Sequence, residues 1–493
     1  MKGDFSFMKI NLKTYLDKMY ACWVGKNIGG TMGTPYEGAR QMNDIQGFVT
    51  DANVVLPNDD LDLQLIWLYA IEKCGIAGLD AKRLGEFWLS YITPHWNEYG
   101  VGKANMKLGI QPPLSGECFN NWKDSNGAWI RTEIWASLAP GAPDVAMKYA
   151  YEDACVDHGT AEGTIAAMFV AALESAAYVE SDRFKLIDVA LSKIPEESRV
   201  AKSIRLLLEL YAKGVDYKAA RNAILEQNSD IGDGWFEAPS NVAYTILGLI
   251  WGEGDFKKSM IYAINCGDDT DCTGATIGSI MGIMGGMKAI PEDWRGHIGD
   301  AIVTISTANG RMNGEKLPQT CTELTERVLA QAQKVLDFNG ADVTLVEGEE
   351  EIPEGVADLF IADDKFAKEL VARKRYTYRE DFAYATAYVT LDGDPRIEAN
   401  GSFKIHTRFV NNYREYANPP YLLKFRWLLP EGFTVKGSKS AILPEFNSHY
   451  NGEVEVDFEI VAPESPEAVN RVVLEVLAEG RFTAAYLPVV LFA

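Results

Sequence analysis

Two short groups of acidic residues, about 200 residues apart, each stand directly before a strongly apolar stretch. The first is "NDD" at 58–60, and the second is "DDTD" at 268–271. Carboxylates held this close together repel one another unless a cation or a captured proton balances their charge. Hard divalent cations such as Mg²⁺ prefer carboxylate and neutral oxygens as ligands. The two groups are therefore a candidate cation site.

A purely structural interpretation fits each group taken alone. Asn58 or Asp59 is a suitable helix N-cap, and an acid in the first turn complements the helix dipole. N-capping uses one such residue, however, and dipole complementation rarely requires consecutive aspartates. Because two such groups occur, we favour the cation hypothesis. It predicts that the carboxylates of Asp59, Asp60, Asp269 and Asp271 converge in one site.

The ligand types available argue against zinc. The chain has only five histidines, and none is spaced as His-x-x-x-His, whereas zinc sites rely on histidine and cysteine. Asn58 instead adds a neutral carbonyl oxygen beside two carboxylates. A pair of hard cations can share bridging carboxylates and orient a water molecule as a nucleophile. Metal-assisted hydrolysis is the chemistry that this pattern favours.

A regular series of glycines indicates how the second acidic group is positioned. A spacing of four residues places glycines on one face of a helix and leaves that face without side chains. Another backbone can then approach very closely. We therefore predict a central helix with the acids at its N-terminus. The glycines are at positions 274, 278, 282 and 286.

The apolar pattern changes once along the chain. Up to about residue 340 the apolar positions recur with helical spacing, and several of these helices are apolar almost all round. Residues 346–359 are acidic and contain proline, and alternating stretches rich in β-branched and aromatic residues follow. We predict a multidomain protein with an all-α catalytic domain at 10–343, an acidic linker at 344–358, and a C-terminal antiparallel β-sandwich at 359–493.

Composition excludes several classes of partner. A net charge of -23 argues against nucleic acid, which requires a basic surface. The apolar run after Asp271 is shorter than the roughly 20 residues of a membrane span, and the N-terminus shows no signal peptide. The seven cysteines form no Cys-x-x-Cys pair, which suits a reducing compartment. We predict a cytoplasmic protein that binds neither nucleic acid nor membrane; its oligomeric state is not indicated.

Five segments, in the right order between about residues 15 and 335, resemble the ADP-ribosylglycohydrolase family. Members carry an early Thr-Asp-Asp-Thr and a late Gly-Gly-Asp-Thr-Asp-Thr segment, which together hold two Mg²⁺ or Mn²⁺ ions. "NDDL" at 58–61 and "GDDTDCT" at 267–273 are similar to them. The other three similar segments are "GKNIGGTMGTPYEG" (25–38), "SNGAWIR" (125–131) and "DHGTAEG" (157–163).

The resemblance implies roles for individual residues. Glu37 matches the family's glutamate near the scissile bond, where it acts as acid/base or orients the attacking water. With Asp60 it forms the predicted catalytic pair. One or two Mg²⁺ or Mn²⁺ ions are the implied cofactors. Their predicted ligands are Asn58, Asp59, Asp60, Asp269, Asp271 and Thr273.

The implied substrate contacts lie in two of the similar segments. Each has an ordinary structural alternative: a lone histidine at a helix end is often a cap or a core hydrogen-bonding residue, and Asn-Gly is a common turn. Tryptophan rings stack on bases and sugars, yet most are core residues. The predicted contacts are Ser125, Asn126, Gly127, Trp129 and His158.

The chain also departs from the family pattern. Cys272 stands where a serine or threonine ligand is usual, and a thiol is a poor partner for Mg²⁺. Either Thr273 substitutes for it, or the second ion binds more weakly, or only one ion binds. Asp268 replaces a glycine, and Trp129 replaces a smaller residue in the loop that would approach a diphosphate.

Three functions are compatible with these features. The first is a metal-dependent hydrolase that releases ADP-ribose from a modified protein or a small molecule. The second is a glycosidase or nucleoside-type hydrolase acting on another carbohydrate, which Trp129, Asp268 and the extra sandwich favour. The third is a non-catalytic binding protein on the same fold. The presence of Asp59, Asp60, Asp269, Asp271 and Glu37 argues against the third.

Overall fold

The computed structural model describes residues 8–231, 236–307, 311–312, 315–363, 365–412, 420–445 and 452–493. Backbone contacts divide the chain into two compact units. The first comprises the residues up to Lys103 together with Asn120–Ala372, and the second comprises Ala104–Phe119 together with Arg373–Ala493. No helix in these described ranges is long and apolar enough to cross a lipid bilayer.

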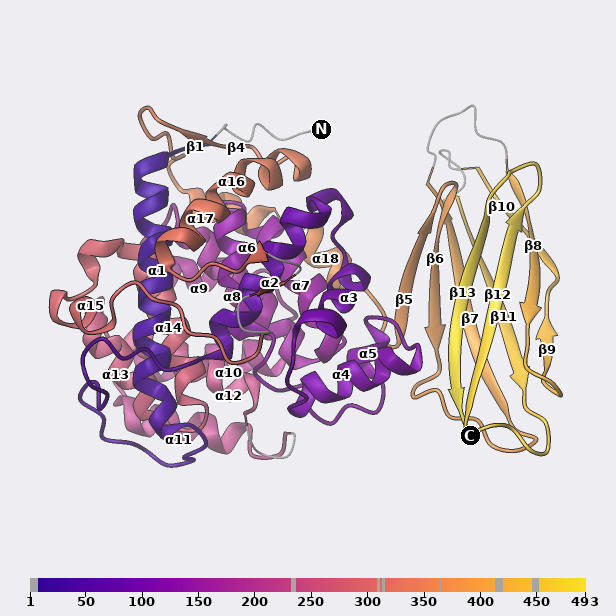
Figure 1. The fold of residues 1–493 in the computed structure, drawn as a ribbon, viewed down its shortest axis with the longest axis horizontal. Helices are drawn as coiled ribbons and strands as arrows, with labels where there is room; N and C mark the ends of the chain where they lie inside the picture. Colours follow the sequence, from indigo (N-terminus) through magenta and orange to yellow (C-terminus); the bar gives the residue numbers. More distant parts are fainter. Residues whose placement is uncertain are drawn as a thin grey trace. The chain divides into compact units, whose positions relative to one another are not determined.

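The first unit is predominantly helical (Figure 1). It also contains a parallel strand pair, β1 with β4, and a short hairpin, β2 with β3. The helices are α1 (Leu12–Gly33), α2 (Asp59–Cys74), α3 (Ala81–Tyr91), α4 (Asn97–Leu108, which crosses the division between the units), α6 (Glu133–Leu138), α7 (Pro143–His158), α8 (Glu162–Ala177), α9 (Arg183–Leu191), α10 (Arg199–Ala212), α11 (Tyr217–Gln227), α12 (Ala238–Trp251), α13 (Phe256–Asn265), α14 (Thr270–Gly285), α15 (Glu292–Ile298), α16 (Cys321–Asn339), α17 (Val356–Ala362) and α18 (Lys365–Val371). The strands are β1 (Met8–Asn11), β2 (Arg311–Met312), β3 (Glu315–Lys316) and β4 (Val343–Val346).

Helices α1 and α14 pack against each other backbone to backbone (Figure 1). A methyl group on Gly25 would overlap the carbonyl of Gly278, and one on Gly29 would overlap the carbonyl of Gly274. The pairs run in opposite directions along the two chains, so the helices are antiparallel. The predicted glycine face of α14 thus meets a second glycine face on α1. Both helices are buried along this contact, which confirms the predicted central position.

Replacing Gly29 by alanine tests this helix contact. The added methyl group would meet main-chain atoms of Gly274, which cannot rotate away as a side chain can. We expect Gly29→Ala to lower the free energy of unfolding by about 3 kcal/mol or more, or to prevent folding. Thermal unfolding measures this. In Gly296→Ala, within α15, the methyl group meets no atom of the described structure, so that control should unfold at or above the wild-type temperature. Equal melting of Gly29→Ala and wild type would contradict the contact.

The second unit consists of two antiparallel sheets that share one apolar core. Alternating burial along the strands, as in β7, places every second side chain in this core. The observed strands confirm the predicted order of a helical region followed by antiparallel sheets. The five-stranded sheet has the order β5 (Thr377–Phe382), β6 (Ala385–Leu391), β7 (Ser402–Asn411), β11 (Glu453–Val461), β9 (Thr434–Gly437), and the four-stranded sheet has the order β10 (Ser440–Leu443), β8 (Tyr421–Leu428), β12 (Val469–Ala478), β13 (Ala484–Phe492).

The division between the units differs from the predicted boundaries. Residues 104–119, including α5 (Leu114–Glu117), belong with the sheets, because Ile110, Leu114 and Cys118 are buried in their core. Within the predicted linker, β4 extends to Val346 and pairs with β1. Helix α17 begins in the predicted linker and ends in the predicted sandwich domain, where α18 also lies, yet both helices belong to the first unit. Backbone pairing and contacts with lysine side chains hold these segments in the first unit. The composition of a segment does not reveal contacts of this kind.

Candidate metal-binding active site

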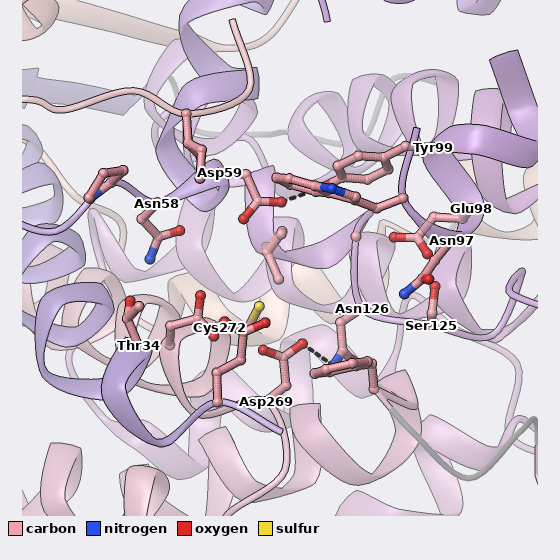
Figure 2. A pocket seen from close by; sticks show the side chains of 18 of the residues that line it. Thr34, Asn58, Asp59, Asn97, Glu98, Tyr99, Ser125, Asn126, Asp269 and Cys272 are labelled. Carbon is pink, nitrogen blue, oxygen red and sulfur yellow. Dashed lines mark hydrogen bonds between the residues drawn. The ribbon is translucent and has the colours of Figure 1, made fainter. Parts of the chain in front are cut away.

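A cavity of about 620 Å³ lies in the first unit (Figure 2). Its wall combines segments from distant parts of the sequence: the end of α1, the start of α2, the start of α4, the loop at 125–127 and the start of α14. Carboxylates gather on this wall. Those that line it are Glu37, Asp59, Glu98, Asp269 and Asp271.

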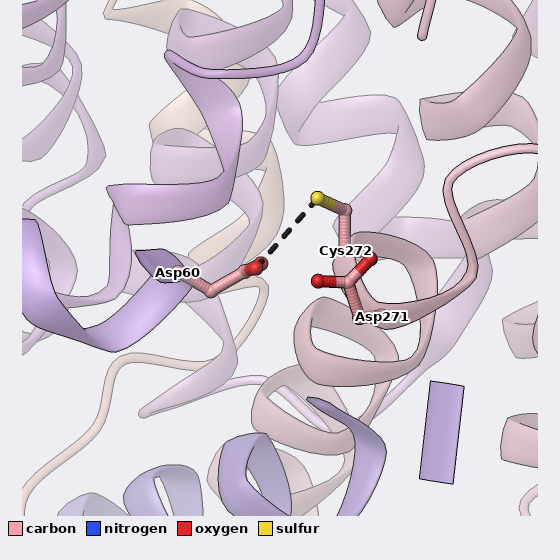
Figure 3. A group of neighbouring side chains, drawn as sticks. All are labelled: Asp60, Asp271 and Cys272. Carbon is pink, nitrogen blue, oxygen red and sulfur yellow. Dashed lines mark hydrogen bonds between the residues drawn. The ribbon is translucent and has the colours of Figure 1, made fainter. Parts of the chain in front are cut away.

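Two clusters of potential metal ligands meet at this cavity (Figures 2 and 3). One ligand atom from each of Glu37, Asp269 and Asp271 lies within 4.8 Å of the others. The same limit applies to Asp60, Asp271 and Cys272. Asp271 is common to both clusters, and Asp59 lines the same cavity. The predicted convergence of the two acidic groups is therefore confirmed, whereas the roles of the individual residues stay predictions.

The antiparallel contact of α1 and α14 explains why Glu37 lies beside Asp271. It places the C-terminal end of α1 next to the N-terminal end of α14, and a single 3₁₀ turn (Thr34–Tyr36) then leads to Glu37. Two backbone hydrogen bonds hold the following residues: Gly38 donates to the Asp268 carbonyl at 2.8 Å, and Asp268 donates to the Ala39 carbonyl at 2.8 Å. The main chain thus sets the position of the glutamate.

Asp268 itself does not add an unbalanced charge to the cavity. Its φ of 67° is left-handed, a conformation for which glycine is the usual residue. Its carboxylate lies 3.6 Å from Nε of Arg40 and accepts a 3.0 Å hydrogen bond from Asn241. It is absent from the cavity lining. Asp268 therefore no longer favours a substrate other than ADP-ribose, contrary to the prediction from the sequence.

The first acidic group occupies the N-terminus of α2. The Oδ1 atom of Asn58 caps the helix by accepting from the Asp60 amide at 2.7 Å, so the structural interpretation is correct for this residue. Asp59 accepts a 2.9 Å hydrogen bond from the Tyr99 hydroxyl. Thr273, a predicted ligand, donates instead to the Thr270 carbonyl at 3.3 Å and does not line the cavity. It is not placed to substitute for Cys272.

Burial and mutual repulsion raise the pKa values of these acids. The charge of Asp271, with burial, raises the pKa of Glu37 to about 8. Burial, with the charge of Asp271, raises the pKa of Asp59 to about 6. Burial also raises the pKa values of Asp60, Asp269 and Asp271. Such a set favours either protons or a bound cation.

Two oxygen atoms show that the residues fit a divalent cation. Oδ1 of Asp60 and Oδ1 of Asp271 are buried and accept no hydrogen bond within the described part of the chain. Buried carboxylate oxygens normally have partners, since leaving one without a partner costs free energy. A divalent cation would supply the missing interaction. The carboxylate-rich donor set also suits such an ion.

A buried lysine beneath the site was missed by sequence reasoning. Nζ of Lys26 donates to Glu133 at 2.6 Å and lies 3.7 Å from Oδ1 of Asp60. Burial alone would lower the pKa of Lys26, but the carboxylates of Glu133 and Asp60 raise it above its usual value. Lys26 therefore stays charged and partly balances Asp60. Lys26 is the only charged residue between Lys18 and Glu37, and this isolation was the available signal.

The loop at 125–127 supports the second acidic group. Asn126 donates from Nδ2 to Asp269 at 2.6 Å (Figure 2), and its Oδ1 accepts from the Trp129 indole at 2.9 Å. Trp129 is fully buried and does not line the cavity. The prediction that it contacts substrate is therefore corrected: its indole N–H positions Asn126. Ser125, Asn126 and Gly127 do line the cavity, as a substrate-binding loop would.

His158 is also separated from the cavity. It is fully buried, with Nδ1 2.9 Å from Asp157 and Nε2 3.3 Å from the Ser125 hydroxyl. Nη2 of Arg131 donates to Oδ1 of the same aspartate, Asp157, at 2.8 Å. The predicted direct contact with substrate is corrected to an indirect one through Ser125. His158 is instead a buried residue that forms hydrogen bonds in the core, which was the structural alternative to substrate binding.

The fold and the two ligand clusters define a class of helical proteins with acidic side chains gathered at one cavity. A sequence model described as ADP-ribosylglycohydrolase matches residues 11–334. Since this is more than half of the chain, the protein belongs to the ADP-ribosylglycohydrolase family, a family of hydrolases.

Comparisons with individual proteins add detail. No curated protein sequence matches the chain significantly. A solved structure titled "ADP-ribosylglycohydrolase-related protein complex" is similar, with 19% identity, 66% of this chain and 100% of that chain covered, and a TM-score of 0.45. A FixG-related protein from Vibrio parahaemolyticus matches with 6% identity over 22% of this chain and 97% of that chain, with a TM-score of 0.18.

The raised pKa values predict how stability depends on pH when no cation is present. Glu37 has a folded-state pKa of about 8 and Asp59 one of about 6, against roughly 4 in an unfolded chain. The folded state therefore binds these protons more tightly, and the stability that they contribute is lost as pH rises from about 4 to 8. In EDTA, the melting temperature should fall between pH 5 and 8, on the order of 5 °C.

A variant identifies the source of this pH dependence. The charge of Asp271 is the largest cause of the raised pKa of Glu37, so Asp271→Asn should make the melting curve less dependent on pH. Saturating divalent cation should have a similar effect in the wild type, because it competes with the protons. A wild-type melting temperature that rises from pH 5 to 8 in EDTA would contradict the raised pKa values.

Proposed function

We propose that this protein hydrolyses a glycosidic bond with the help of Mg²⁺ or Mn²⁺, and that it releases ADP-ribose from a modified protein or small molecule. One observation carries the proposal: two ligand clusters share Asp271 at one cavity, one made of three carboxylates and the other of two carboxylates and the Cys272 thiol. Membership of a hydrolase family supports the reaction class.

The aspartates of both acidic groups would hold the cations. When bound, these ions would supply Lewis-acid chemistry, which orients sugar hydroxyls and lowers the pKa of a water molecule. Tyr99 and Asn126 orient the carboxylates of Asp59 and Asp269 through their hydrogen bonds. Fixed hydrogen-bond partners of this kind maintain ligand orientation and strengthen binding.

Glu37 is the residue placed to move a proton. It is more exposed than the aspartates around it, and its carboxyl group lines the cavity. With a pKa near neutrality, a carboxyl group can give up and take back a proton during turnover. In this role Glu37 would either donate a proton to the leaving group or accept one from the attacking water.

A second candidate function has its own support. Among the described residues that line the cavity there is no lysine or arginine, while Trp96, Tyr99 and Phe236 add aromatic surface. A diphosphate would meet several carboxylates, and His95 is the one basic side chain among the described residues of this wall. A neutral sugar would instead find rings on which to stack. This composition favours a glycosidase or nucleoside-type hydrolase acting on a carbohydrate other than ADP-ribose.

One substrate comparison separates the two candidates. The purified protein, with Mg²⁺ or Mn²⁺, should be incubated with peptides carrying ADP-ribose on arginine or serine, and with a panel of aryl glycosides and nucleosides. Release of ADP-ribose, measured by mass spectrometry and abolished by EDTA, supports the first candidate. Cleavage of a glycoside or nucleoside alone supports the second. Metal-independent cleavage, or no cleavage of either class, contradicts the proposal.

A further inference from the structure

We propose that the two ligand clusters are different kinds of cation site, and that the cluster of Asp60, Asp271 and Cys272 takes a thiophilic divalent cation such as Co²⁺ or Zn²⁺ in preference to Mg²⁺. This inference rests on the proposed function, because it assigns a second ion to the same site. It concerns the sulfur atom, which the all-oxygen pattern of the family does not contain.

The position of Cys272 points to a ligand role (Figure 3). Its Sγ lies 3.6 Å from Oδ2 of Asp60, and one ligand atom from each of the three residues lies within 4.8 Å of the others. All three side chains are at least nine-tenths buried, with exposed fractions of 0%, 5% and 6% for Asp60, Asp271 and Cys272. The thiol is thus directed at the acids and not into an apolar core.

A buried oxygen of Asp271 marks the space between these residues as a ligand position. Oδ1 of Asp271 has no hydrogen-bond partner among the described residues. Oδ1 of Asp60 also lacks a hydrogen bond, but it lies 3.7 Å from Nζ of Lys26. The thiol can satisfy one carboxylate oxygen at most, and Figure 3 shows its bond to Asp60. Thr273, whose hydroxyl would have supplied a hard ligand, donates to Thr270 instead. Sulfur is therefore the third donor that this cluster offers.

Ligand chemistry then separates the two clusters. Mg²⁺ requires near-octahedral oxygen coordination and keeps several of its waters. The cluster of Glu37, Asp269 and Asp271 provides oxygens only and lines the open cavity, so it suits that ion. A thiolate beside two carboxylates suits Zn²⁺ or Co²⁺ instead, because these ions accept four-coordinate geometry and bind sulfur well.

The binding step is a ligand exchange without oxidation. The thiol of Cys272 releases its proton to solvent, and the resulting thiolate donates an electron pair to the divalent cation. The hydrogen bond from sulfur to Asp60 is replaced by bonds from both groups to the ion. The cation releases water ligands in exchange, S–H is the only covalent bond of the protein that is broken, and no other reactant is needed.

Cobalt provides a test that does not depend on substrate. Metal-free protein under reducing, oxygen-free conditions should be titrated with Co²⁺ alone while its near-ultraviolet absorption and melting temperature are recorded. A sulfur-to-cobalt charge-transfer band should appear in the wild type and saturate with one site per chain. Cys272→Ser should lose this band and bind Co²⁺ at least about tenfold more weakly, the loss that removal of even an indirect ligand partner causes.

A second cysteine provides the matched control. Cys266 is equally buried but donates to the Tyr262 carbonyl and does not line the cavity. Cys266→Ser should therefore keep the wild-type band and Co²⁺ affinity. Mg²⁺ should shift the melting temperature of Cys272→Ser by at least as much as that of the wild type, because the substitution replaces sulfur by oxygen.

The outcomes separate this inference from the proposed function. If Co²⁺ raises the melting temperature without a charge-transfer band, sulfur is not a ligand and the inference is wrong, whereas Mg²⁺-dependent hydrolysis still stands. If Cys272→Ser keeps the band, the inference is also wrong. If the band follows Cys272 but no substrate is cleaved with any cation, the site assignment holds and the proposed hydrolysis fails.

Discussion

Asp269→Asn is expected to reduce hydrolysis at least about 100-fold, because it removes a negative ligand at the point where the cavity meets α14. The change hardly alters side-chain volume, and the new amide oxygen can still accept from Asn126, so folding should survive. Saturating Mg²⁺ or Mn²⁺ should raise the melting temperature of the wild type by mass action. That increase should shrink sharply in Asp269→Asn. Asp59→Asn should behave in the same way.

Without a cation, we expect the order of stability of the wild type and Asp269→Asn to be reversed. Asp269 is buried, and both burial and the charge of Asp271 raise its pKa. Neutralising it removes repulsion that the folded state otherwise contains. In EDTA at pH 8 the melting temperature of Asp269→Asn should therefore equal or exceed that of the wild type.

The adjacent acid is a close control for this prediction. Asp268 is also buried, but its carboxylate binds Asn241 and lies beside Arg40, outside the cavity. Asparagine tolerates its left-handed backbone conformation. Asp268→Asn should keep hydrolysis within a few-fold of the wild type and should keep the full response to Mg²⁺. Equal loss of activity in Asp268→Asn and Asp269→Asn would show that local disruption, and not ligand loss, is responsible.

The second large effect is expected at Glu37. Glu37→Gln should lower kcat by about 10²–10⁴-fold, the range that a positioned proton-transfer residue contributes. KM should change little, because the aspartates that hold the ions and the loop at 125–127 remain. The Mg²⁺-induced rise in melting temperature should also remain, which distinguishes this variant from Asp269→Asn.

Glu37 also lies within 4.8 Å of the ligand atoms of Asp269 and Asp271, so the same variant tests the alternative role. If Glu37→Gln loses the response to Mg²⁺, Glu37 is a metal ligand. If it hydrolyses substrate at the wild-type rate, it neither binds an essential ion nor transfers the proton. The pH profile of residual kcat should lose the limb that Glu37 contributes.

The elements that position the site were largely predictable from the sequence. A glycine every fourth residue has one common physical consequence in a helix, which is a close approach of another backbone, and α14 shows it. The convergence of the two acidic groups followed from charge repulsion and from the resemblance to a metal-binding family. Both arguments use short stretches of sequence. These stretches lie far apart in the chain, and local sequence does not show how the fold brings them together.

Side-chain partners were less predictable. Trp129 and His158 lie in segments with the right family pattern, yet both are buried and act on Asn126 and Ser125. A sequence shows that a residue lies near a loop, but not toward which side its ring turns. Similarly, the sequence shows that Asn58 is able to cap a helix or bind an ion, and only the 2.7 Å bond to the Asp60 amide identifies the cap.

The unit boundaries failed for a different reason. Ile110 and Leu114 are ordinary apolar residues in a helical context, and their burial in the core of the sheets depends on strands more than 250 residues later. Periodicity describes one element at a time. Which distant surface an apolar face meets is a property of the whole fold.

The glycine contact between α1 and α14 also limits how the site can change in evolution. Main chain lies against main chain there, so the spacing between Glu37 and Asp271 has a single permitted register. An insertion or deletion of one residue within either contact face would rotate the remaining glycines by about 100° and turn the acids away from each other. Length changes are thus expected in the loops around the cavity, where they alter substrate choice, and excluded from residues 21–33 and 270–282.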